Sequence, residues 1–406
     1  MVSSGPLCAA STADASGAAT VAAAAAGQDA ACRFGVIADV QYADKDDAYN
    51  FAKTRLRQVP TSGWANHKVE ASFFIRFFKW RVSLHYRKTA KTLGNAVEWW
   101  NSFQSPKVDF VLNLADLIDG HNRGTNTQKE AMATVLQELD KLDCRDKLVN
   151  MVGNHELYCF TRSALSEPQV FPPSHLPYSL TRPETLPDSE YPTCDPSTFY
   201  FSFVACPGWR VVILDPYDLS VMREGGGRHG IELLKGNGLD PEGTALCQSH
   251  NPNDIGIQKD FFQGLQGLDS RWVPFNGGFG KEQIAWLRNL LKGCHESNTN
   301  VIICSHVVIH PDATFDSNCR TLAWNYDDVL NAMYEYPCTK LVLCGHLHRE
   351  VYHCDDHGIH HLSLPSPMEW DADKCAITCD ILSSGNVQVF GSGGVKDRYF
   401  DCHNQS

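Results

Sequence analysis

The sequence predicts an α/β fold in which a layered sheet carries helices on its faces. Two observations support this prediction. Apolar, strand-like runs alternate with amphipathic helical stretches over residues 33–152, which is the pattern of a sheet covered by helices. Five apolar runs along the chain are rich in Val, Ile, Leu and Phe, as buried parallel strands are, and each leads directly into Asp, Asn or His.

The expected elements follow one another without an internal repeat. Apolar residues at Leu93, Val97 and Trp100 have helical spacing. The first five elements are a strand from Arg33, a helix over 87–104, a strand over 108–114, a helix over 127–142 and a strand over 147–152. The later ones are a surface loop over 160–198, strands over 199–205 and 209–215, a Gly-rich excursion over 220–280, a helix over 281–292, and short strands around 351–394.

Two segments stand apart from this pattern. Residues 1–32 are rich in Ala, Ser, Gly and Thr and lack the bulky apolar groups that offset ordering entropy, so we expect a disordered tail. Residues 33–400 are expected to form a single domain. Within it, the basic and aromatic stretch 55–83 reads as an atypical insertion without a role, or alternatively as a surface that contacts a membrane or a partner.

Composition limits the function classes. The formal net charge of −12 argues against non-specific nucleic-acid binding. No apolar run reaches the length of a membrane span, and the N-terminal stretch has no basic region typical of a targeting signal. Several of the 16 cysteines lie inside apolar strands, as buried free thiols do, so a reducing cytoplasm is expected. We expect a monomer that acts on a small molecule.

Metal-capable side chains follow the five apolar runs. Ligands collect at the carboxyl ends of strands in an α/β sheet, so these side chains are expected to share one site. Carboxylate, amide and imidazole donors without thiolates indicate two divalent metal ions. The candidates are Asp39 and Gln41, Asp116, Asn154 with His155, His306, and His346 with His348.

The order of these segments resembles the calcineurin-like metallophosphoesterase superfamily. The family blocks D-x-H, G-D, G-N-H-[DE], an isolated His and G-H-x-H correspond to segments 34–41, 110–120, 149–156, 301–310 and 341–348. The sequence is most similar to one branch, the manganese-dependent ADP-ribose/CDP-alcohol diphosphatases. That likeness extends to IADVQYAD (37–44), GNHELY (153–158), LDPYDLSV (214–221), HNPN (250–253), FNGGF (275–279) and LAWNY (322–326).

The resemblance implies a fold and a set of roles. The fold would be a sandwich of two mixed β-sheets flanked by helices. Asp116 would bridge two metal ions, most suitably Mn²⁺, and a hydroxide shared by the metals would attack phosphorus in line with the leaving group. His155 would stabilise or protonate the leaving oxygen. One metal set would be completed by Asp39, Gln41 and His348, and the other by Asn154, His306 and His346.

Two residues depart from the superfamily pattern. Gln41 stands where His is usual, and the ADP-ribose/CDP-alcohol branch shares this Gln. An amide oxygen is a weaker donor than imidazole and favours a harder ion such as Mn²⁺ over Zn²⁺. Ala115 replaces the usual Gly before the bridging Asp, and its methyl group is expected to crowd a tight turn.

The implied activity is hydrolysis of the phosphoanhydride bond in ADP-ribose or in CDP-choline and CDP-glycerol type substrates. Aromatic residues in 275–279 and 322–326 could stack on the base, or they could pack the core. The substrate-contact candidates are Cys319, Trp324, Asn325 and Tyr326. Alternatives are a phosphomonoesterase or protein phosphatase, and a catalytically silent scaffold.

Five further histidines have no place in the expected site. We expect them on the surface or in loops. The four nearest the C-terminus form a His-rich patch that could bind metal weakly. These residues are His310, His353, His357, His360 and His361.

Overall fold

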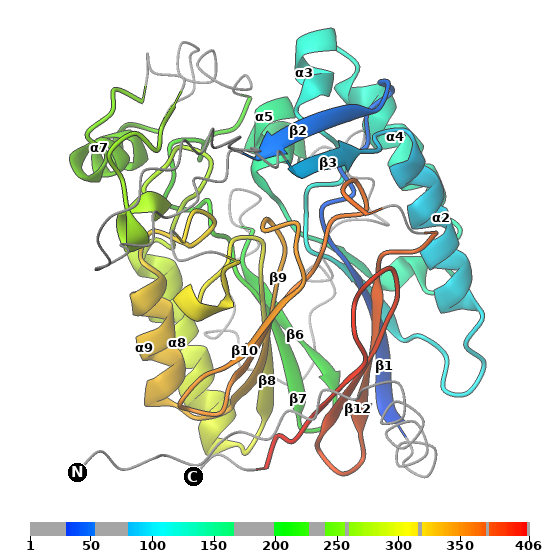
Figure 1. Ribbon diagram of the computed structural model, residues 1–406. Coiled ribbons are helices and arrows are strands. Elements are labelled where there is room, and N and C mark those ends of the chain that lie inside the picture. Colours follow the sequence, from blue (N-terminus) through cyan, green and yellow to red (C-terminus); the bar gives the residue numbers. More distant parts are fainter. Residues whose placement is uncertain are drawn as a thin grey trace, which may run out of the picture.

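Two six-stranded sheets face each other in the computed structural model, and helices cover their outer faces (Figure 1). The predicted α/β sandwich of two mixed sheets is confirmed. None of the helices in the described part of the chain has the length and apolar character that a membrane crossing requires. The structure describes residues 30–52, 80–165, 199–226, 240–255, 260–315, 319–370 and 373–403.

The first sheet combines a parallel half with an antiparallel half, in the order β14-β13-β12-β1-β4-β5. The parallel strands are β1 (Ala30–Ile37), β4 (Phe110–Asn113) and β5 (Leu148–Asn150). The antiparallel strands are β12 (Ile377–Leu382), β13 (Val387–Gly391) and β14 (Arg398–Phe400). Helices α2 (Lys88–Asn101) and α4 (Gln128–Leu139) lie beside this sheet (Figure 1). A β-carbon at Gly35 would lie 2.5 Å from the Trp100 ring, so glycine there lets α2 approach β1 closely.

The second sheet has the order β10-β11-β9-β8-β7-β6. Its parallel strands are β7 (Trp209–Ile213), β8 (Asn300–Ser305), β9 (Thr339–Cys344) and β11 (His360–Ser363). Its antiparallel strands are β6 (Phe201–Cys206) and β10 (Val351–Cys354). Helices α8 (Lys281–Glu296) and α9 (Tyr326–Glu335) cover its outer face (Figure 1).

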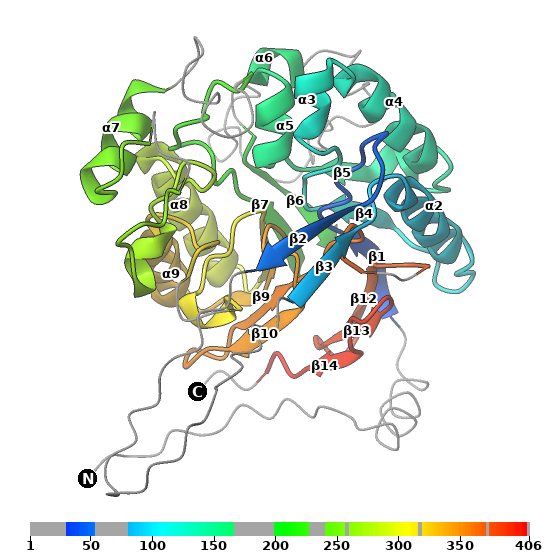
Figure 2. The ribbon, with the colours of Figure 1, turned by 45° about the horizontal axis from the view of Figure 1, so that its top comes forward.

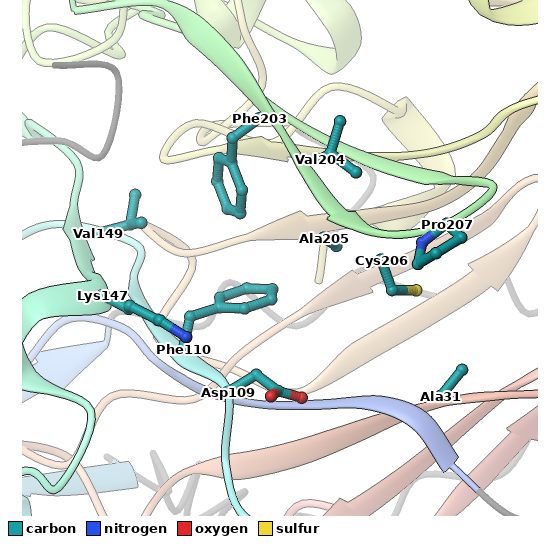
Figure 3. Close-up of a pocket in the computed structure, with 10 residues that line it drawn as sticks. All are labelled: Ala31, Asp109, Phe110, Lys147, Val149, Phe203, Val204, Ala205, Cys206 and Pro207. Carbon is teal, nitrogen blue, oxygen red and sulfur yellow. The ribbon is translucent and has the colours of Figure 1, made fainter. Parts of the chain in front are cut away.

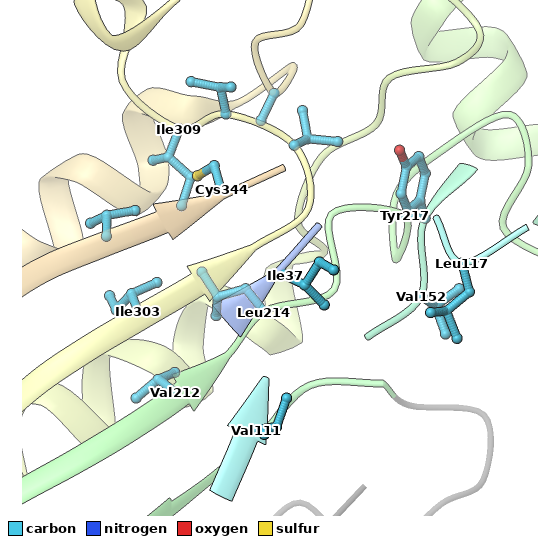
Figure 4. Close-up of a cluster of buried hydrophobic side chains, with 14 of the residues drawn as sticks. Ile37, Val111, Leu117, Val152, Val212, Leu214, Tyr217, Ile303, Ile309 and Cys344 are labelled. Atoms are coloured by element: carbon cyan, nitrogen blue, oxygen red, sulfur yellow. The ribbon is translucent and has the colours of Figure 1, made fainter. Parts of the chain in front are cut away.

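Apolar side chains from both sheets fill the space between them. Phe110 stacks on Phe34 of β1, with ring centroids 4.9 Å apart, and meets Phe203 of β6 edge-on at 5.3 Å. A second buried cluster lies under the helices and reaches the strand ends through Ile37, Leu117 and Tyr217 (Figure 4). Because apolar side chains pack against both faces of each sheet, the sequences of the parallel strands are continuous apolar runs.

Apart from η1, which directly precedes β5, the shorter elements surround the carboxyl ends of the parallel strands. The α-helices among them are α3 (His121–Thr125), α5 (Asn154–Cys159), α6 (Arg162–Leu165) and α7 (Pro241–His250). The 3-10 helices are η1 (Arg145–Lys147), η6 (Gly267–Arg271) and η7 (Pro311–Ala313). A separate ribbon of β2 (Ala48–Ala52) and β3 (Trp80–Leu84) lies at this same end of the molecule (Figure 2).

Several boundaries differ from the sequence prediction. The first strand begins at Ala30 rather than Arg33, because Ala30 pairs with Leu382 of β12. The expected insertion over 55–83 ends in strand β3, and its residues 55–79 lie outside the described residues. Residues 1–29 of the expected tail and 166–198 of the expected loop also lie outside them. The excursion over 220–280 contains helix α7 and the turn η6.

Candidate dinuclear metal site

Strand ends from both sheets converge on one buried group of side chains. On the first sheet, Asp39 and Gln41 follow β1, Asp116 follows β4, and Asn154 begins α5 after β5. On the second sheet, His306 follows β8, and His346 and His348 follow β9. The structure thus brings together all seven residues that the sequence indicated as metal ligands. Asp116 and His306 are both 0% exposed, so their charges are compensated within the protein.

The backbone at these strand ends is strained. Positive φ is rare for residues with a β-carbon, and clusters of such residues mark functional sites. Among the described residues, the six at this site have φ values of 46–80°. They are Asp39, Gln41, Ala115, Asp116, His346 and His348. Short left-handed turns therefore aim the donor groups of both sheets into one volume.

Asp116 occupies the centre of the group. Its Oδ2 lies 3.2 Å from Nε2 of Gln41 and 3.3 Å from Nε2 of His306. Its Oδ1 accepts a hydrogen bond from the backbone N–H of His155 at 2.9 Å. One carboxylate oxygen thus faces a residue of each predicted metal set, which is the arrangement of a bridging ligand.

The first metal set is Asp39, Gln41 and His348. Oδ1 of Asp39 lies 3.4 Å from Nε2 of His348, and the Gln41 amide lies 2.9 Å from the same nitrogen. Glu369 contacts the other ring nitrogen, Nδ1, at 2.9 Å. A proton on Nδ1 shared with Glu369 leaves the Nε2 lone pair free, as a metal-binding imidazole requires. If the Gln41 amide is rotated by half a turn, its oxygen takes the place of its nitrogen and faces the position where a metal ion would bind Nε2 of His348.

The second metal set is Asn154, His306 and His346. Nδ1 of His306 donates to the carbonyl oxygen of Leu114 at 2.7 Å, so Nε2, 3.2 Å from Oδ1 of Asn154, is the nitrogen that a metal ion could bind. Nε2 of His346 donates to Oδ1 of Asn276 at 2.8 Å, so Nδ1 is its free nitrogen. Partners outside the group therefore orient both imidazoles.

Electrostatics at the centre favour added positive charge. Burial by itself raises the pKa of Asp116, but the nearby His306 and His155 lower it well below its usual range. Burial lowers the pKa of His306, yet Asp116 reverses this effect and raises the pKa to about 9. A buried carboxylate that draws a proton onto its neighbouring imidazole is also suited to a cation.

His155 lies beside the proposed metal ligands. Its Nδ1 accepts a hydrogen bond from the N–H of Gly120 at 2.9 Å, so the neutral ring carries its proton on Nε2. That Nε2 lies 3.9 Å from Oδ2 of Asp116. Asp119, 3.4 Å from Nδ1, adds negative charge behind the ring. His155 therefore presents a proton donor toward the bridging carboxylate.

Glu156 is a structural support that the sequence analysis did not identify. The carboxylate is 0% exposed and accepts hydrogen bonds from the N–H groups of Asp116, Leu117 and Gly153 at 2.7–3.0 Å. Burial first, and then Asp116, raise the pKa of Glu156 to about 7. A β-carbon at Gly153 would lie 2.1 Å from Oδ1 of Asp116, so only glycine fits there. The Gly-Asn-His-Glu motif was the available signal for both residues.

The predicted substrate contacts are mostly structural. Trp324 is 0% exposed and stacks on Trp272, so of the two alternatives for its ring the structure shows packing in the core. The Asn325 amide bonds both backbone groups of Phe279, which joins the two expected substrate segments to each other. Cys319 is buried, with Sγ 3.7 Å from Oγ1 of Thr314. Tyr326 is half-buried near the Arg271 guanidinium, 5.6 Å from its ring centroid.

A cavity of about 230 Å³ lies away from the metal ligands (Figure 3). Of its lining residues, Asp109 immediately precedes β4, Lys147 ends η1 directly before β5, and Ala31 lies at the start of β1. The cavity is therefore at the amino ends of the parallel strands, whereas the metal ligands follow their carboxyl ends. None of the proposed ligands lines it.

The donor set fits divalent metal ions. The ligand atoms of Asp116, His306 and His346 lie within 4.8 Å of one another. Carboxylate and amide oxygens together with imidazoles, and no thiolate, suit Mn²⁺ and related ions. In His306, His346 and His348, one ring nitrogen has a protein partner outside the ligand group, and the other faces the group. Metal binding therefore does not require these partners to move.

Comparisons with known proteins agree with this geometry. A manganese-dependent ADP-ribose/CDP-alcohol diphosphatase from Mus musculus is 31% identical over 371 residues, covering 90% of this chain and 92% of that protein. One from Arabidopsis thaliana is 31% identical over 336 residues, covering 83% of this chain and 86% of that protein.

A solved structure is also similar. The crystal structure of a dimetal phosphatase from Danio rerio superposes with a TM-score of 0.68 at 27% identity, covering 92% of this chain and 99% of that one. The family model described as calcineurin-like phosphoesterase matches residues 32–350. The chain belongs to the calcineurin-like phosphoesterase family.

Proposed function

We propose that this protein hydrolyses the phosphoanhydride bond of nucleoside diphosphate derivatives, with ADP-ribose and CDP-alcohols as substrates and Mn²⁺ as the metal. The observation that carries the proposal is the position of Asp116, whose Oδ2 lies 3.2 Å from Gln41 and 3.3 Å from His306. The names of relatives 31% identical over 90% of the chain support the substrate class.

The residues of the site divide the work. Two divalent cations bound there would hold phosphate oxygens and lower the pKa of a shared water molecule. Asp116 and Asp39 provide the negative charge that holds such cations. His155 keeps its proton on Nε2 and donates it to the oxygen of the leaving phosphate. Hydrolysis of ADP-ribose in this way gives AMP and ribose 5-phosphate.

Gln41 supports the choice of Mn²⁺. Its neutral amide stands where imidazole is usual in the superfamily, and an oxygen donor binds Zn²⁺ less well relative to harder ions. The second amide donor, Asn154, has its Oδ1 within 3.1 Å of the Tyr217 hydroxyl and 3.2 Å of His306. An oxygen-rich set of this kind is suited to a hard ion.

An aromatic path beside His346 replaces Trp324 as the candidate contact for the base. The ring centroid of Phe275 lies 6.1 Å from that of His346 and 5.8 Å from that of Phe262. The guanidinium of Arg320 lies 4.6 Å above the Phe262 ring. Stacking of a base on an exposed aromatic face contributes ~1–3 kcal/mol. Phe262→Ala should therefore raise KM for ADP-ribose and leave that for p-nitrophenyl phosphate unchanged.

A substrate panel tests the proposed function. ADP-ribose, CDP-choline, CDP-glycerol and p-nitrophenyl phosphate should be compared with Mn²⁺, with Mg²⁺ and after removal of metal by chelation. We expect AMP from ADP-ribose and CMP from the CDP-alcohols, in reactions that need Mn²⁺. Preferred release of p-nitrophenol would favour a phosphomonoesterase. No hydrolysis of any substrate by metal-loaded protein would favour a silent scaffold.

We also propose that the protein works as a monomer in the cytoplasm, on a small nucleotide. None of the fourteen cysteines among the described residues forms a disulfide, as a reducing compartment permits. Sedimentation at several concentrations would test the monomer, and a dimer at micromolar concentration would contradict it.

A further inference from the structure

A second group of metal-capable side chains lies outside the proposed active site. Its histidines were expected on the surface or in loops, but His310 is 8% and His361 2% exposed, and Asp355 beside them is 6% exposed. The expectation was wrong for His361, which belongs to strand β11, whose residues are all buried. Two overlapping sets of three make up the group: His310 with Asp312 and His353, and His310 with Asp355 and His361.

Strand pairing brings two of these histidines together. His353 of β10 lies directly opposite His361 of the antiparallel strand β11. Residues opposite each other in an antiparallel pair have side chains on the same face. The neighbouring His360 points to the other face, where its ring stacks 4.5 Å from Phe400, so it is not part of the group.

His310 approaches the pair from a different part of the chain. It follows β8 in the same segment that contains His306 and forms the N-cap of η7. Its ring centroid lies 4.6 Å from that of His353 and 4.8 Å from that of His361, and the latter two are 6.4 Å apart. Three imidazoles bound to one ion at ~2.0–2.1 Å have centroids on the order of 5 Å apart. The two distances from His310 match this spacing, whereas His353 and His361 would have to approach each other to bind the same ion.

The Asp355 carboxylate fixes the protonation of His361. Oδ2 of Asp355 lies 3.0 Å from Nε2 of His361, and Oδ1 accepts backbone N–H groups from His357 and Ile359 at 3.0 and 2.8 Å. Since the carboxylate is an acceptor, Nε2 carries the proton and Nδ1 keeps a lone pair. That buried Nδ1 has no hydrogen-bond partner among the described residues. A carboxylate behind an imidazole with a free second nitrogen is the usual support of a metal ligand.

These observations point to a ligand, and we propose that His310, His353 and His361 form a second metal site for a single imidazole-preferring cation of the Zn²⁺ type. Asp355 orients His361 from behind, and Asp312, with Oδ2 3.9 Å from Nε2 of His353, supplies a fourth donor or nearby negative charge. Three imidazoles favour Zn²⁺ over Mn²⁺, in contrast to the oxygen-rich active site. Burial and the neighbouring histidines lower the pKa of His310 to about 4, so its ring is neutral at physiological pH.

Binding at this site is coupled to the turn η7. Nδ1 of His310 accepts the N–H of Asp312 at 3.1 Å, so coordination through Nδ1 would replace that hydrogen bond. The start of η7 must then shift when the ion binds. Because His306 lies four residues before His310, the shift would occur in the segment that carries an active-site ligand.

Metal content of the whole protein tests the proposal. Wild type, His353→Ala and His361→Asn would be stripped by chelation, reconstituted with Zn²⁺, passed through a desalting column and analysed for zinc per chain. We expect each variant to retain one zinc fewer than wild type, whatever the active site itself retains. Equal zinc in wild type and in both variants would overturn the proposal.

Two controls separate the site from other histidines and from unfolding. His357 lies in the same stretch, is exposed and stacks on Tyr334 with centroids 3.6 Å apart. His357→Ala should keep the wild-type zinc content, and loss of one zinc there would instead indicate adventitious binding. If His361→Asn does not fold, His353→Ala alone decides, because the side chain of His353 is 28% exposed and tolerates truncation.

Discussion

The two sheets provide different donor atoms to the active site. The loops after β1, β4 and β5 of the first sheet contribute carboxylate and amide groups, whereas those after β8 and β9 of the second contribute only imidazoles. Carboxylate donors carry negative charge and can bridge two metal ions, whereas imidazoles are neutral donors that bind one ion in a defined direction. Neither sheet alone provides both kinds of donor, so the site forms only where the strand ends of the two sheets meet.

The sheets also hold their donors in different ways. On the first sheet, Glu156 fixes the backbone around Asp116 through N–H groups. On the second, each histidine is oriented through its ring: His306 by the carbonyl of Leu114, and His348 by Glu369. Since Leu114 follows β4, the first sheet orients a ligand of the second. The five predictions below test these separate roles.

Asp116→Asn should have the largest effect, because it removes the central carboxylate that the first sheet contributes. The change removes a negative charge from between two cations and should lower kcat/KM at least a thousandfold, which is about 4 kcal/mol. Asp109→Asn, at the amino end of the same strand, is the matched control and should retain activity. A loss of less than tenfold in Asp116→Asn would remove this residue from the bridging role.

His155→Ala should slow the chemical step without depleting metal. Loss of a proton donor costs ~10²–10⁴-fold in kcat, and the loss should shrink for p-nitrophenyl esters, whose leaving group needs no proton. Elemental analysis and kinetics on both substrates measure this, with exposed His121→Ala as the control. A metal-depleted variant would mean that His155 is itself a ligand.

Glu369→Gln should weaken metal binding at the set formed by Asp39, Gln41 and His348, because Glu369 orients His348. The amide cannot accept the Nδ1 proton of His348 as strongly, and partners of this kind are worth ~10–100-fold in metal affinity. Titration of activity with Mn²⁺ measures the shift. Glu350→Gln, whose carboxylate pairs with Arg398 rather than with a proposed ligand, should leave the titration unchanged. An unshifted midpoint in Glu369→Gln would show that Glu369 does not support the ligand.

Gln41→His should give the first sheet an imidazole donor of the kind that the second sheet provides. The stronger imidazole donor should tighten binding at that metal and extend metal usage toward Zn²⁺. Activity against the concentration of each metal compares the two proteins. Identical Mn²⁺ affinity and metal preference would mean that Gln41 is not a ligand.

Ala115→Gly should have the smallest effect, and it should raise the stability of the folded protein. Ala115 has φ +80°, where a β-carbon costs roughly 1–2 kcal/mol, and glycine loses ~0.4–1 kcal/mol through the unfolded state. The net gain should lie between zero and about 1.6 kcal/mol, seen as a slightly higher Tm. Ala38→Gly is the control, because Ala38 is equally buried without positive φ and should lose stability. A lower Tm for Ala115→Gly would show that its methyl packing outweighs the strain.

Local patterns in the sequence were sufficient for most of the fold and for the ligand set. Buried parallel strands are written as apolar runs, so the strands before Asp116 and His306 were recognisable, and the carboxyl-end rule placed their donors together. The helical spacing of Leu93, Val97 and Trp100 likewise predicted α2. These features depend on near neighbours in the chain, which is why sequence alone determined them.

Tertiary structure decided what depends on contacts between distant segments. Glu156 and Glu369 are unremarkable acidic residues until folding sets them against Asp116 and His348, and Trp324 could be assigned to the core only once Trp272 lay against it. His353 and His361 lie side by side because the register of β10 and β11 pairs them. His310 reaches them from the loop after β8. Burial, tautomer and register are properties of packed neighbours, and no local pattern encodes them.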